Sequence, residues 1–228
     1  MKRNSKKNNR STVIIAIIVM LSSMFISCGE DSGVEGEYDN NSVLTESQKY
    51  ALSYMWHEEK LAYDIYTSLN DIYPIRQMKN ITKSETKHME SVREIVESYN
   101  LDITNLSDSE SGYSEEVLES MSIGEYKLDK IQALYDLLYS KGKNSEKDAL
   151  EVACMVEVTD IDDLANFLED ETLPQDIKSS FTFLIEGSYK HYWAFDRALK
   201  SIDVENGCSS LGTIDGVDYC HPEYPGGE

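Results

Sequence analysis

The sequence places a glutamate and a histidine three residues apart, Glu85 and His88, in a segment that predicts an α-helix. Thr82 followed by Glu85 is a capping box, so we expect the helix to begin there and to run over residues 83–99. Residues three apart lie on one face of a helix, so the carboxylate and the imidazole point the same way. Because a buried carboxylate is costly unless it is paired or bound to a metal, this pair indicates a metal site.

Three other segments carry apolar residues at helical spacing, and in each of them polar residues interrupt the apolar stripe. These segments predict helices over residues 46–73, 146–168 and 175–202. Thr45 with Gln48 forms a capping box for the first, and Ser145 or Asn144 would cap the second. Polar residues replace apolar ones near the middle of each stripe: Glu59 in the first, Glu157 and Asp160 in the second, and Ser188 and His191 in the third. Four such helices predict a four-helix bundle.

In a four-helix bundle these interruptions fall at one level. Four carboxylates and two imidazoles would then meet in an otherwise apolar core: Glu59, Glu85, His88, Glu157, Asp160 and His191. Four like charges repel strongly at low dielectric, and two divalent or trivalent cations would neutralise them. Carboxylate oxygens with a few imidazole nitrogens suit iron or manganese, with zinc as a further option. The sequence therefore predicts a site for two metal ions, with iron as the expected metal.

The predicted fold is all-α, with the four core helices antiparallel. No segment shows strand-like alternation, and all four prolines lie between predicted helices or in the C-terminal tail. Residues 101–124 read as a loop and residues 125–140 as a short amphipathic helix. Together they form a long crossover, with one extra helix, between the second and third core helices. The bundle domain is expected to span residues 44–203.

Motifs in the first two helices resemble those of rubrerythrins and other ferritin-like proteins. The stretch from Glu59 to Tyr66 matches an E-x2-A-x3-Y pattern, and Glu85 with His88 matches an E-x-x-H pattern. Over residues 44–202 the chain is also similar to a bacterial and archaeal ferritin-like family labelled a domain of unknown function. The stretches that carry this similarity are EEKLAYDIY, SETKHM, EVTDIDDL and GSYKHYWAF.

The resemblance implies a ferritin-like two-metal centre, with a single glutamate on each of two helices and Glu-x-x-His on the other two. The ligands that it carries over are Glu59, Glu157, and Glu85 with His88. The fourth helix departs from this pattern, because Ser188 stands three residues before His191 where the motif has a glutamate. We infer that Asp160 supplies the missing carboxylate. The cysteine module of rubrerythrins is absent, which excludes electron transfer by that route.

The N-terminus predicts export to a membrane surface. Residues 1–27 combine a basic start with an apolar run too short for a transmembrane helix, as in a signal peptide. Cys28 follows directly and resembles the lipidated cysteine of bacterial lipoproteins; an ordinary signal peptide or a membrane anchor is the alternative. Residues 28–43 read as a flexible acidic tether. The expected location is the bacterial cell envelope, outside the cytoplasm, on a lipid anchor.

Charge and cysteines restrict the function further. The formal net charge of −21 excludes nucleic-acid binding through a basic surface. Cys208 and Cys220 lie in an irregular tail expected over residues 204–228, and we expect them to form a disulfide in an oxidising compartment. Cys154 lies inside a predicted helix and is expected to pack as a small apolar residue.

Several polar residues near the six candidates compete with them as ligands. Glu58 is the strongest alternative to Glu59, because a shift of one residue in the stripe would exchange the two. Glu186 could replace Asp160 but lies off its stripe, and we expect it at the surface together with His57. Three nearby tyrosines could hold the metal ligands in place or take part in redox chemistry, but we expect each to serve in packing: Tyr66, Tyr189 and Tyr192.

Two functions of different classes follow from these features. The first is a membrane-tethered di-iron protein that reduces O2 or peroxide or handles iron, as a ferroxidase or a peroxidase-like enzyme. The second is a non-enzymatic surface lipoprotein whose helices form an interaction or metal-sensing module. A purely structural bundle with hydrogen-bonded carboxylates is a third reading. The sequence names no redox partner and leaves the formation of a homodimer open.

Overall fold

The computed structural model describes residues 44–101 and 120–227. This part of the chain contains five α-helices: α1 (Glu46–Ile72), α2 (Arg76–Ser98), α4 (Asp129–Gly142), α5 (Glu146–Leu168) and α6 (Gln175–Ser201). A short 3-10 helix η2 (Gly207–Leu211) follows, and then an antiparallel hairpin of β1 (Thr213–Ile214) and β2 (Val217–Asp218). The predicted all-α fold class is therefore confirmed for the described residues.

Some sequence-based predictions concern residues outside the described ranges. The signal peptide over residues 1–27, the lipidation of Cys28 and the tether over residues 28–43 all lie there. So does most of the loop predicted over residues 101–124. Within the ranges that are described, no helix combines the length and the apolar character needed to cross a bilayer.

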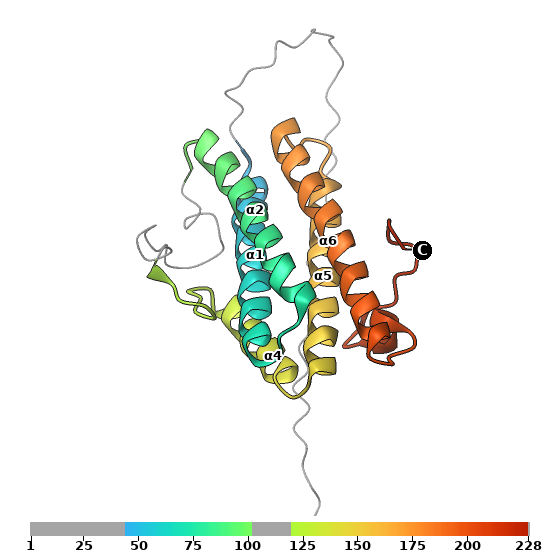
Figure 1. Ribbon diagram of the computed structural model, residues 1–228. Helices are drawn as coiled ribbons and strands as arrows, with labels where there is room; N and C mark the ends of the chain where they lie inside the picture. Colours follow the sequence, from blue (N-terminus) through green and yellow to red (C-terminus); the bar gives the residue numbers. More distant parts are fainter. Residues whose placement is uncertain (1–43, 102–119, 228) are drawn as a thin grey trace, which may run out of the picture.

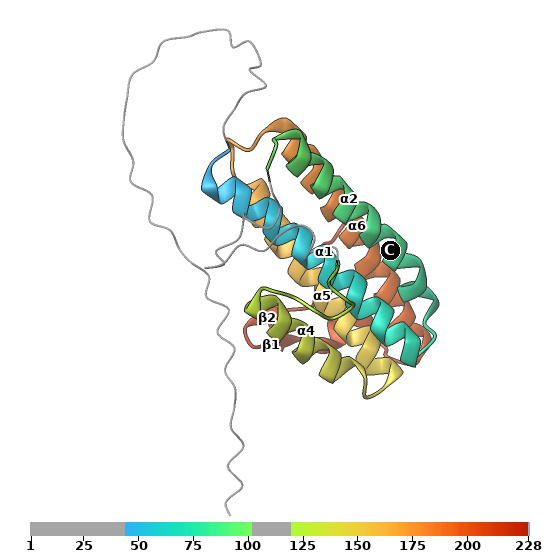
Figure 2. The same cartoon turned by 90° about the vertical axis from the view of Figure 1, so that its left-hand side faces the viewer.

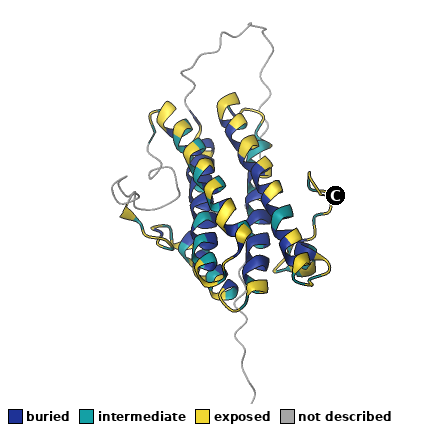
Figure 3. Ribbon diagram, viewed as in Figure 1, coloured by how far each residue is buried: buried dark blue, intermediate teal, exposed yellow. Residues whose placement is uncertain are grey.

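The long helices α1, α2, α5 and α6 lie side by side around a common core (Figure 1). The helix α1 packs against α2 and α5, and α6 packs against the same two helices. The shorter helix α4 packs on α1 and α5 from outside, as the view turned by 90° shows (Figure 2). Buried residues line the facing sides of the long helices, and exposed residues lie on their outer sides (Figure 3). This arrangement turns the four interrupted stripes toward one another.

Local signals place most of the helix ends correctly. The predicted capping box is present at the start of α1, where the Thr45 hydroxyl accepts from the Gln48 backbone and the Gln48 side chain accepts from Thr45 N–H. The helix α5 covers the predicted residues, and the Ser145 hydroxyl, rather than Asn144, caps it by accepting from Asp148 N–H. The helix α6 ends one residue before the predicted end.

The predicted start of the second helix is wrong. The helix α2 begins at Arg76 with Ile75 as its N-cap, and Thr82 lies inside it, where its hydroxyl donates to the Lys79 carbonyl. Pro74 supplies the break, so the turn after α1 is complete before the helix restarts. Because α2 starts earlier than predicted, Glu85 lies near its middle rather than in its first turn. The helix α4 also differs, beginning at Asp129 instead of residue 125.

A buried ion pair on α1 attaches the crossover segment to the core. Lys60 pairs with Asp64, and both side chains are almost fully buried. Asp64 also accepts from the Tyr126 hydroxyl at 2.7 Å and from Gly124 N–H at 2.9 Å. The Lys60 ammonium lies 4.5 Å from the centroid of the Tyr126 ring. Residues 124–126 are therefore held on α1 just before α4 begins.

Replacing Tyr126 with phenylalanine should lower the free energy of unfolding by about 1.5–3 kcal/mol, because a hydrogen bond to a buried charged carboxylate is lost. Urea unfolding followed by circular dichroism measures the change. Tyr139→Phe is the matched control on α4, since the Tyr139 ring packs on Tyr135 and the substitution keeps that ring. A loss of equal size in both variants would show that the Tyr126 hydroxyl does not anchor the crossover.

The predicted pairing of cysteines is wrong. Cys208 forms a disulfide with Cys154 of α5, and Cys220 is free and exposed. Cys154 is therefore a cross-link and not merely a packed apolar residue. After α6 the chain turns back so that η2 lies against α5 and α6, and Cys208 N–H donates to Asp196. The tail is also more ordered than predicted, because it contains η2 and the hairpin.

Candidate metal centre

All six residues predicted as ligands point into the interior of the protein. Their exposed fractions lie between 0% and 7%: Glu59, Glu85, His88, Glu157, Asp160 and His191. Four helices supply them: Glu59 lies on α1, Glu85 and His88 on α2, Glu157 and Asp160 on α5, and His191 on α6. Five of the six form two groups whose potential ligand atoms lie within 4.8 Å of one another.

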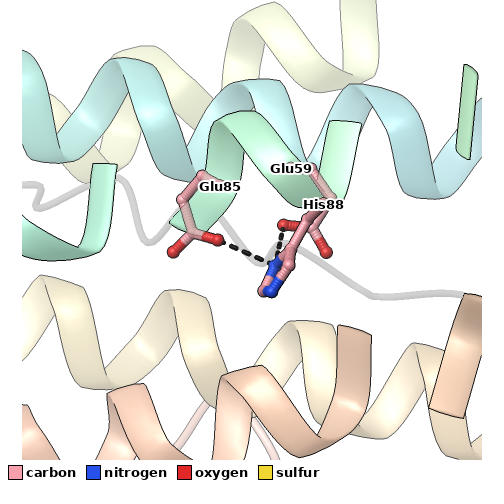
Figure 4. A group of neighbouring side chains, drawn as sticks. All are labelled: Glu59, Glu85 and His88. Atoms are coloured by element: carbon pink, nitrogen blue, oxygen red, sulfur yellow. Dashed lines mark hydrogen bonds and ion pairs between the residues drawn. The ribbon is translucent and has the colours of Figure 1, made fainter. Parts of the chain in front are cut away.

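The first group consists of Glu59, Glu85 and His88 (Figure 4). The His88 Nδ1–H donates to Glu59 Oε2 at 3.0 Å. Glu85 Oε2 lies 2.9 Å from the same nitrogen and forms an ion pair with it, but without the geometry of a hydrogen bond. Three ligand atoms from α1 and α2 thus converge on one point.

The second group uses the other oxygen of the same glutamate. His191 Nδ1 lies 3.1 Å from Glu85 Oε1 and 3.5 Å from Glu157 Oε2. The rings of His88 and His191 are stacked, with centroids 5.5 Å apart. Glu85 therefore stands between two neighbouring groups and offers one oxygen to each. A carboxylate in this position can bridge two metal ions.

Buried atoms without hydrogen-bond partners show that the donor set suits cations. In the part of the chain that the structure describes, no hydrogen bond reaches four buried atoms of the two groups: Glu59 Oε1, Glu85 Oε2, Glu157 Oε2 and His191 Nδ1. An unsatisfied buried polar atom costs about 1–3 kcal/mol. Metal ions would satisfy all four atoms, so the residues fit a pair of cations with oxygen and nitrogen ligands.

In the metal-free protein the two protonated imidazoles supply the positive charge beside the carboxylates. Burial alone would lower the pKa of His88, but Glu59 and Glu85 outweigh it and raise the pKa to about 10. Burial likewise opposes the charge of His191, yet Glu85 and Glu157 raise its pKa well above the ordinary value. Both imidazoles are therefore protonated at neutral pH when no metal is bound.

The carboxylates respond to burial and to these imidazolium charges. Burial would raise the pKa of Glu85, but His191 and His88 lower it to about 2. Burial raises the pKa of Glu59 to about 7, against the opposing attraction of His88. The pKa of Glu157 is also raised by burial, although His191 opposes the change. Glu85 is thus the carboxylate that stays ionised between the two groups.

Asp160 is buried close to the two groups but belongs to neither. Burial raises its pKa well above the ordinary value, and the charges of Glu59, Glu58 and Glu157 raise it further. Asp160, which was predicted to replace the missing glutamate of the fourth helix, thus lies near the ligands but is in neither group. Ser188, which stands in place of that glutamate, donates to Leu184 of its own helix instead.

The competing residues occupy different places. Glu58 is buried beside Tyr54 and Asp163 and belongs to neither group, whereas Glu59 does. Glu186 is exposed, as predicted. The prediction that His57 lies at the surface is wrong, because it is fully buried and its Nδ1–H donates to the Ser53 carbonyl at 2.7 Å.

The chain matches a known protein family over most of this structure. The family described as an uncharacterized protein domain, DUF2202, matches residues 48–209. The chain belongs to the DUF2202 family. The match contains all six candidate ligands and ends just after Cys208 of the disulfide.

An archaeal relative of known structure extends this comparison. The uncharacterized protein MJ0754 of Methanocaldococcus jannaschii is 35% identical over 158 residues, which are 69% of this chain and 78% of that protein. The crystal structure of the hypothetical protein MJ0754 superposes with a TM-score of 0.60 at 33% identity, over 75% of this chain and 87% of that chain. The helical architecture of this DUF2202 domain is thus similar to that of a solved structure.

A tyrosine of the DUF2202 domain has a role that packing alone does not describe. The Tyr66 hydroxyl donates to Glu157 Oε1, so it holds the carboxylate on the side opposite to His191. Tyr192 and Tyr189 differ from it, since the first donates to the Tyr219 carbonyl and the second packs on the Tyr224 ring. For Tyr66 the structure therefore favours the alternative, a tyrosine that holds a candidate ligand, over packing alone.

Gly187 of the DUF2202 domain lies against His88 of the candidate centre and was not among the predicted site residues. A Cβ atom at this position would lie 2.5 Å from Nε2 and 2.6 Å from Cε1 of His88. The signal was a glycine in a helix interior, where it costs about 1 kcal/mol relative to alanine. Its absence of a side chain lets the His88 ring fit between α2 and α6.

Gly187→Ala should lower the affinity of the protein for metal by roughly 10–100-fold, because the added methyl group displaces the His88 ring from Glu59 and Glu85. Ser188→Ala is the matched control, since the Ser188 hydroxyl bonds to its own helix and should not affect the metal. Titration with Fe2+ under anaerobic conditions measures both variants. Equal affinity in Gly187→Ala and wild type would show that the His88 ring is not held as described.

Proposed function

We propose that this DUF2202 domain is a ferritin-like, antiparallel four-helix bundle whose core holds a di-metal carboxylate centre. The observation that supports it most directly is the position of Glu85, which offers one oxygen to each of two buried Glu/His groups. Two adjacent groups that share a carboxylate are the arrangement that a pair of bridged cations needs. The packing of α1, α2, α5 and α6 around these groups agrees with such a bundle.

Under this proposal each ion has three protein ligands. Glu59, His88 and Glu85 hold the first ion, and Glu157, His191 and Glu85 hold the second. Oxygen atoms predominate, with one imidazole per ion and no thiolate, which favours iron or manganese over copper. Of the described cysteines, Cys154 and Cys208 are joined in the disulfide, and Cys220 lies exposed in the tail.

The proposed chemistry is the reduction of O2 or peroxide, or the oxidation of stored or incoming iron. A pair of iron ions would supply the electrons for such a reaction when bound. The protein contributes a site with buried walls, in which carboxylates change partners without exposure to bulk water. Tyr66 holds Glu157 by one oxygen, which leaves the other oxygen to face His191.

We also propose that the domain lies outside the cytoplasm, attached to a membrane through lipidated Cys28. The basic and apolar N-terminal residues support this location. The disulfide between Cys154 and Cys208 supports it independently, because disulfides persist mainly in oxidising compartments. Mass spectrometry of the protein from native membranes would detect the lipid on Cys28.

The test of the metal centre is the amount of iron that the full mature chain binds. We expect two iron ions per chain after anaerobic loading, and a new absorption band in the near ultraviolet after exposure to air. Elemental analysis of protein taken from native cells identifies the natural metal. Protein that retains no metal after reconstitution would refute the proposed centre.

Metal binding should release protons, and the affinity should rise with pH. At pH 7 both His88 and His191 carry protons in the metal-free protein, because their pKa values are raised, and each must lose one to bind a metal. Each displaced proton should increase the apparent affinity about tenfold per pH unit below the pKa of about 10 of His88. Calorimetric titration in two buffers of different ionisation enthalpy measures the release. A binding enthalpy that is the same in both buffers would contradict this expectation.

A further inference from the structure

A second set of carboxylates lies along the interface of α1 and α5, outside the two Glu/His groups. Glu58 of α1 is only 2% exposed, and neither of its oxygens has a hydrogen-bond partner among the described residues. Tyr54 and Asp163 lie beside it and interact with it electrostatically, but neither makes a hydrogen bond of normal geometry to it. A buried carboxylate in this state either takes up a proton, which burial and Asp163 favour by raising the pKa of Glu58 well above its ordinary value, or has a cation beside it.

These carboxylates form a continuous line from the protein surface to the centre. The helices α1 and α5 are antiparallel, because Tyr66 contacts Glu157 at one level and Tyr54 contacts Phe167 at another. By this register Glu58, Glu59 and Asp163 lie at about the same level of the interface, Asp160 lies about one helical turn further in, and Glu157 lies about one turn beyond Asp160. Electrostatic interactions join each to the next, since Asp163 acts on Glu58, and Asp160 interacts with Glu58, Glu59 and Glu157.

The outer end of this line reaches solvent. Asp163 and Tyr54 are partly exposed, whereas Glu58 and Asp160 are buried. Within residues 44–101 and 120–227, no lysine or arginine forms an ion pair with Glu58, Asp160 or Asp163. The acidic line thus lacks a cationic side chain of its own, unlike the buried Asp64, which has Lys60.

We propose that Glu58 and Asp163 form a station at which a divalent cation binds on its way to the centre. This inference rests on the proposed function, because it needs a centre that takes up metal. The two carboxylates do not belong to a cluster of three ligands like those of the centre, so the station binds weakly and passes the ion to Asp160. A line of acidic groups with low-dielectric walls concentrates cations and raises their rate of association by about 10- to 1000-fold.

Two neighbouring aspartates on α5 offer a matched test. Asp163 faces Glu58, whereas Asp162 is exposed and interacts with His221 of the tail. Asp163→Asn and Asp162→Asn remove the same charge from adjacent positions of one helix. Stopped-flow mixing of the metal-free full chain with Co2+ follows loading by visible absorption, and elemental analysis gives the final stoichiometry.

We expect Asp163→Asn to load at least about tenfold more slowly than wild type, and Asp162→Asn to load at the wild-type rate. All three should reach the same final stoichiometry, because the ligands of the centre are intact. Glu58→Gln should show the same slow loading, with circular dichroism as a check of its folding.

Equal loading rates for Asp163→Asn and Asp162→Asn would contradict the proposed station. Equal rates are expected if Glu58 and Asp163 only share a proton. Slow loading confined to Glu58→Gln would also contradict the station, because that change can act through the adjacent Glu59. A wild-type protein that binds no Co2+ at equilibrium would instead refute the proposed metal centre. The final stoichiometry therefore separates failure of the station from failure of the proposed function.

Discussion

Glu85→Gln should abolish the binding of both metal ions, with a loss of affinity of at least about 100-fold for each. Glu85 offers Oε2 to the group of His88 and Oε1 to the group of His191, and among the described residues it is the one member that the two groups share. Glutamine keeps the shape but has no charge and presents an NH2 group in place of one oxygen. The iron content per chain, measured by elemental analysis after anaerobic loading with Fe2+, should fall from two ions to none.

The matched control for this change is Glu90→Gln on the same helix. Glu90 is exposed and belongs to neither Glu/His group, so this variant should bind two ions. A Glu85→Gln protein that still binds two ions would show that the two sites do not share this carboxylate. One retained ion would show that Glu85 serves a single ion, which would also contradict the bridging arrangement.

Cys208→Ala should lower the free energy of unfolding by about 4 kcal/mol under oxidising conditions, because the disulfide to Cys154 closes a loop with a sequence separation of 54. The cross-link also holds η2 and the tail against α5 and α6. Urea unfolding with and without a phosphine reductant measures this contribution. Reduction should destabilise the wild type to a similar extent and leave Cys208→Ala unchanged.

Cys220→Ala is the control, since this cysteine is free and exposed, and its replacement should change stability by less than about 0.5 kcal/mol. Peptide mapping under non-reducing conditions identifies the bonded pair directly. A map that joined Cys208 to Cys220, as the sequence suggested, would contradict the observed cross-link. Destabilisation by Cys220→Ala would point to the same conclusion.

Sequence patterns predicted the helices wherever the deciding signal was local. The capping box at Thr45 and the Ser145 cap each involve residues three apart, and they set the starts of α1 and α5. The start of α2 was mispredicted because a second pattern of the same kind, at Thr82 and Glu85, lies within the helix. Both patterns have the same sequence form, and Pro74 decided between the possible starts by ending the preceding helix.

The sequence by itself placed the members of the two Glu/His groups in the interior. Helical spacing turned Glu59, Glu85, His88 and His191 toward the interior, because the period of 3.6 residues relates each of them to apolar neighbours on its own helix. It also favoured Glu59 over Glu58, and the two Glu/His groups contain Glu59.

Only the tertiary structure decided how these residues are paired. Three contacts join different helices or distant segments. Glu85 lies between two histidines, Gly187 leaves space for His88, and Cys154 is cross-linked to Cys208. The burial of His57 has the same origin, because it lies off the stripe that periodicity identifies. Periodicity and caps act over a few residues, whereas these contacts depend on how close two helices approach, and packing of the whole core sets that distance.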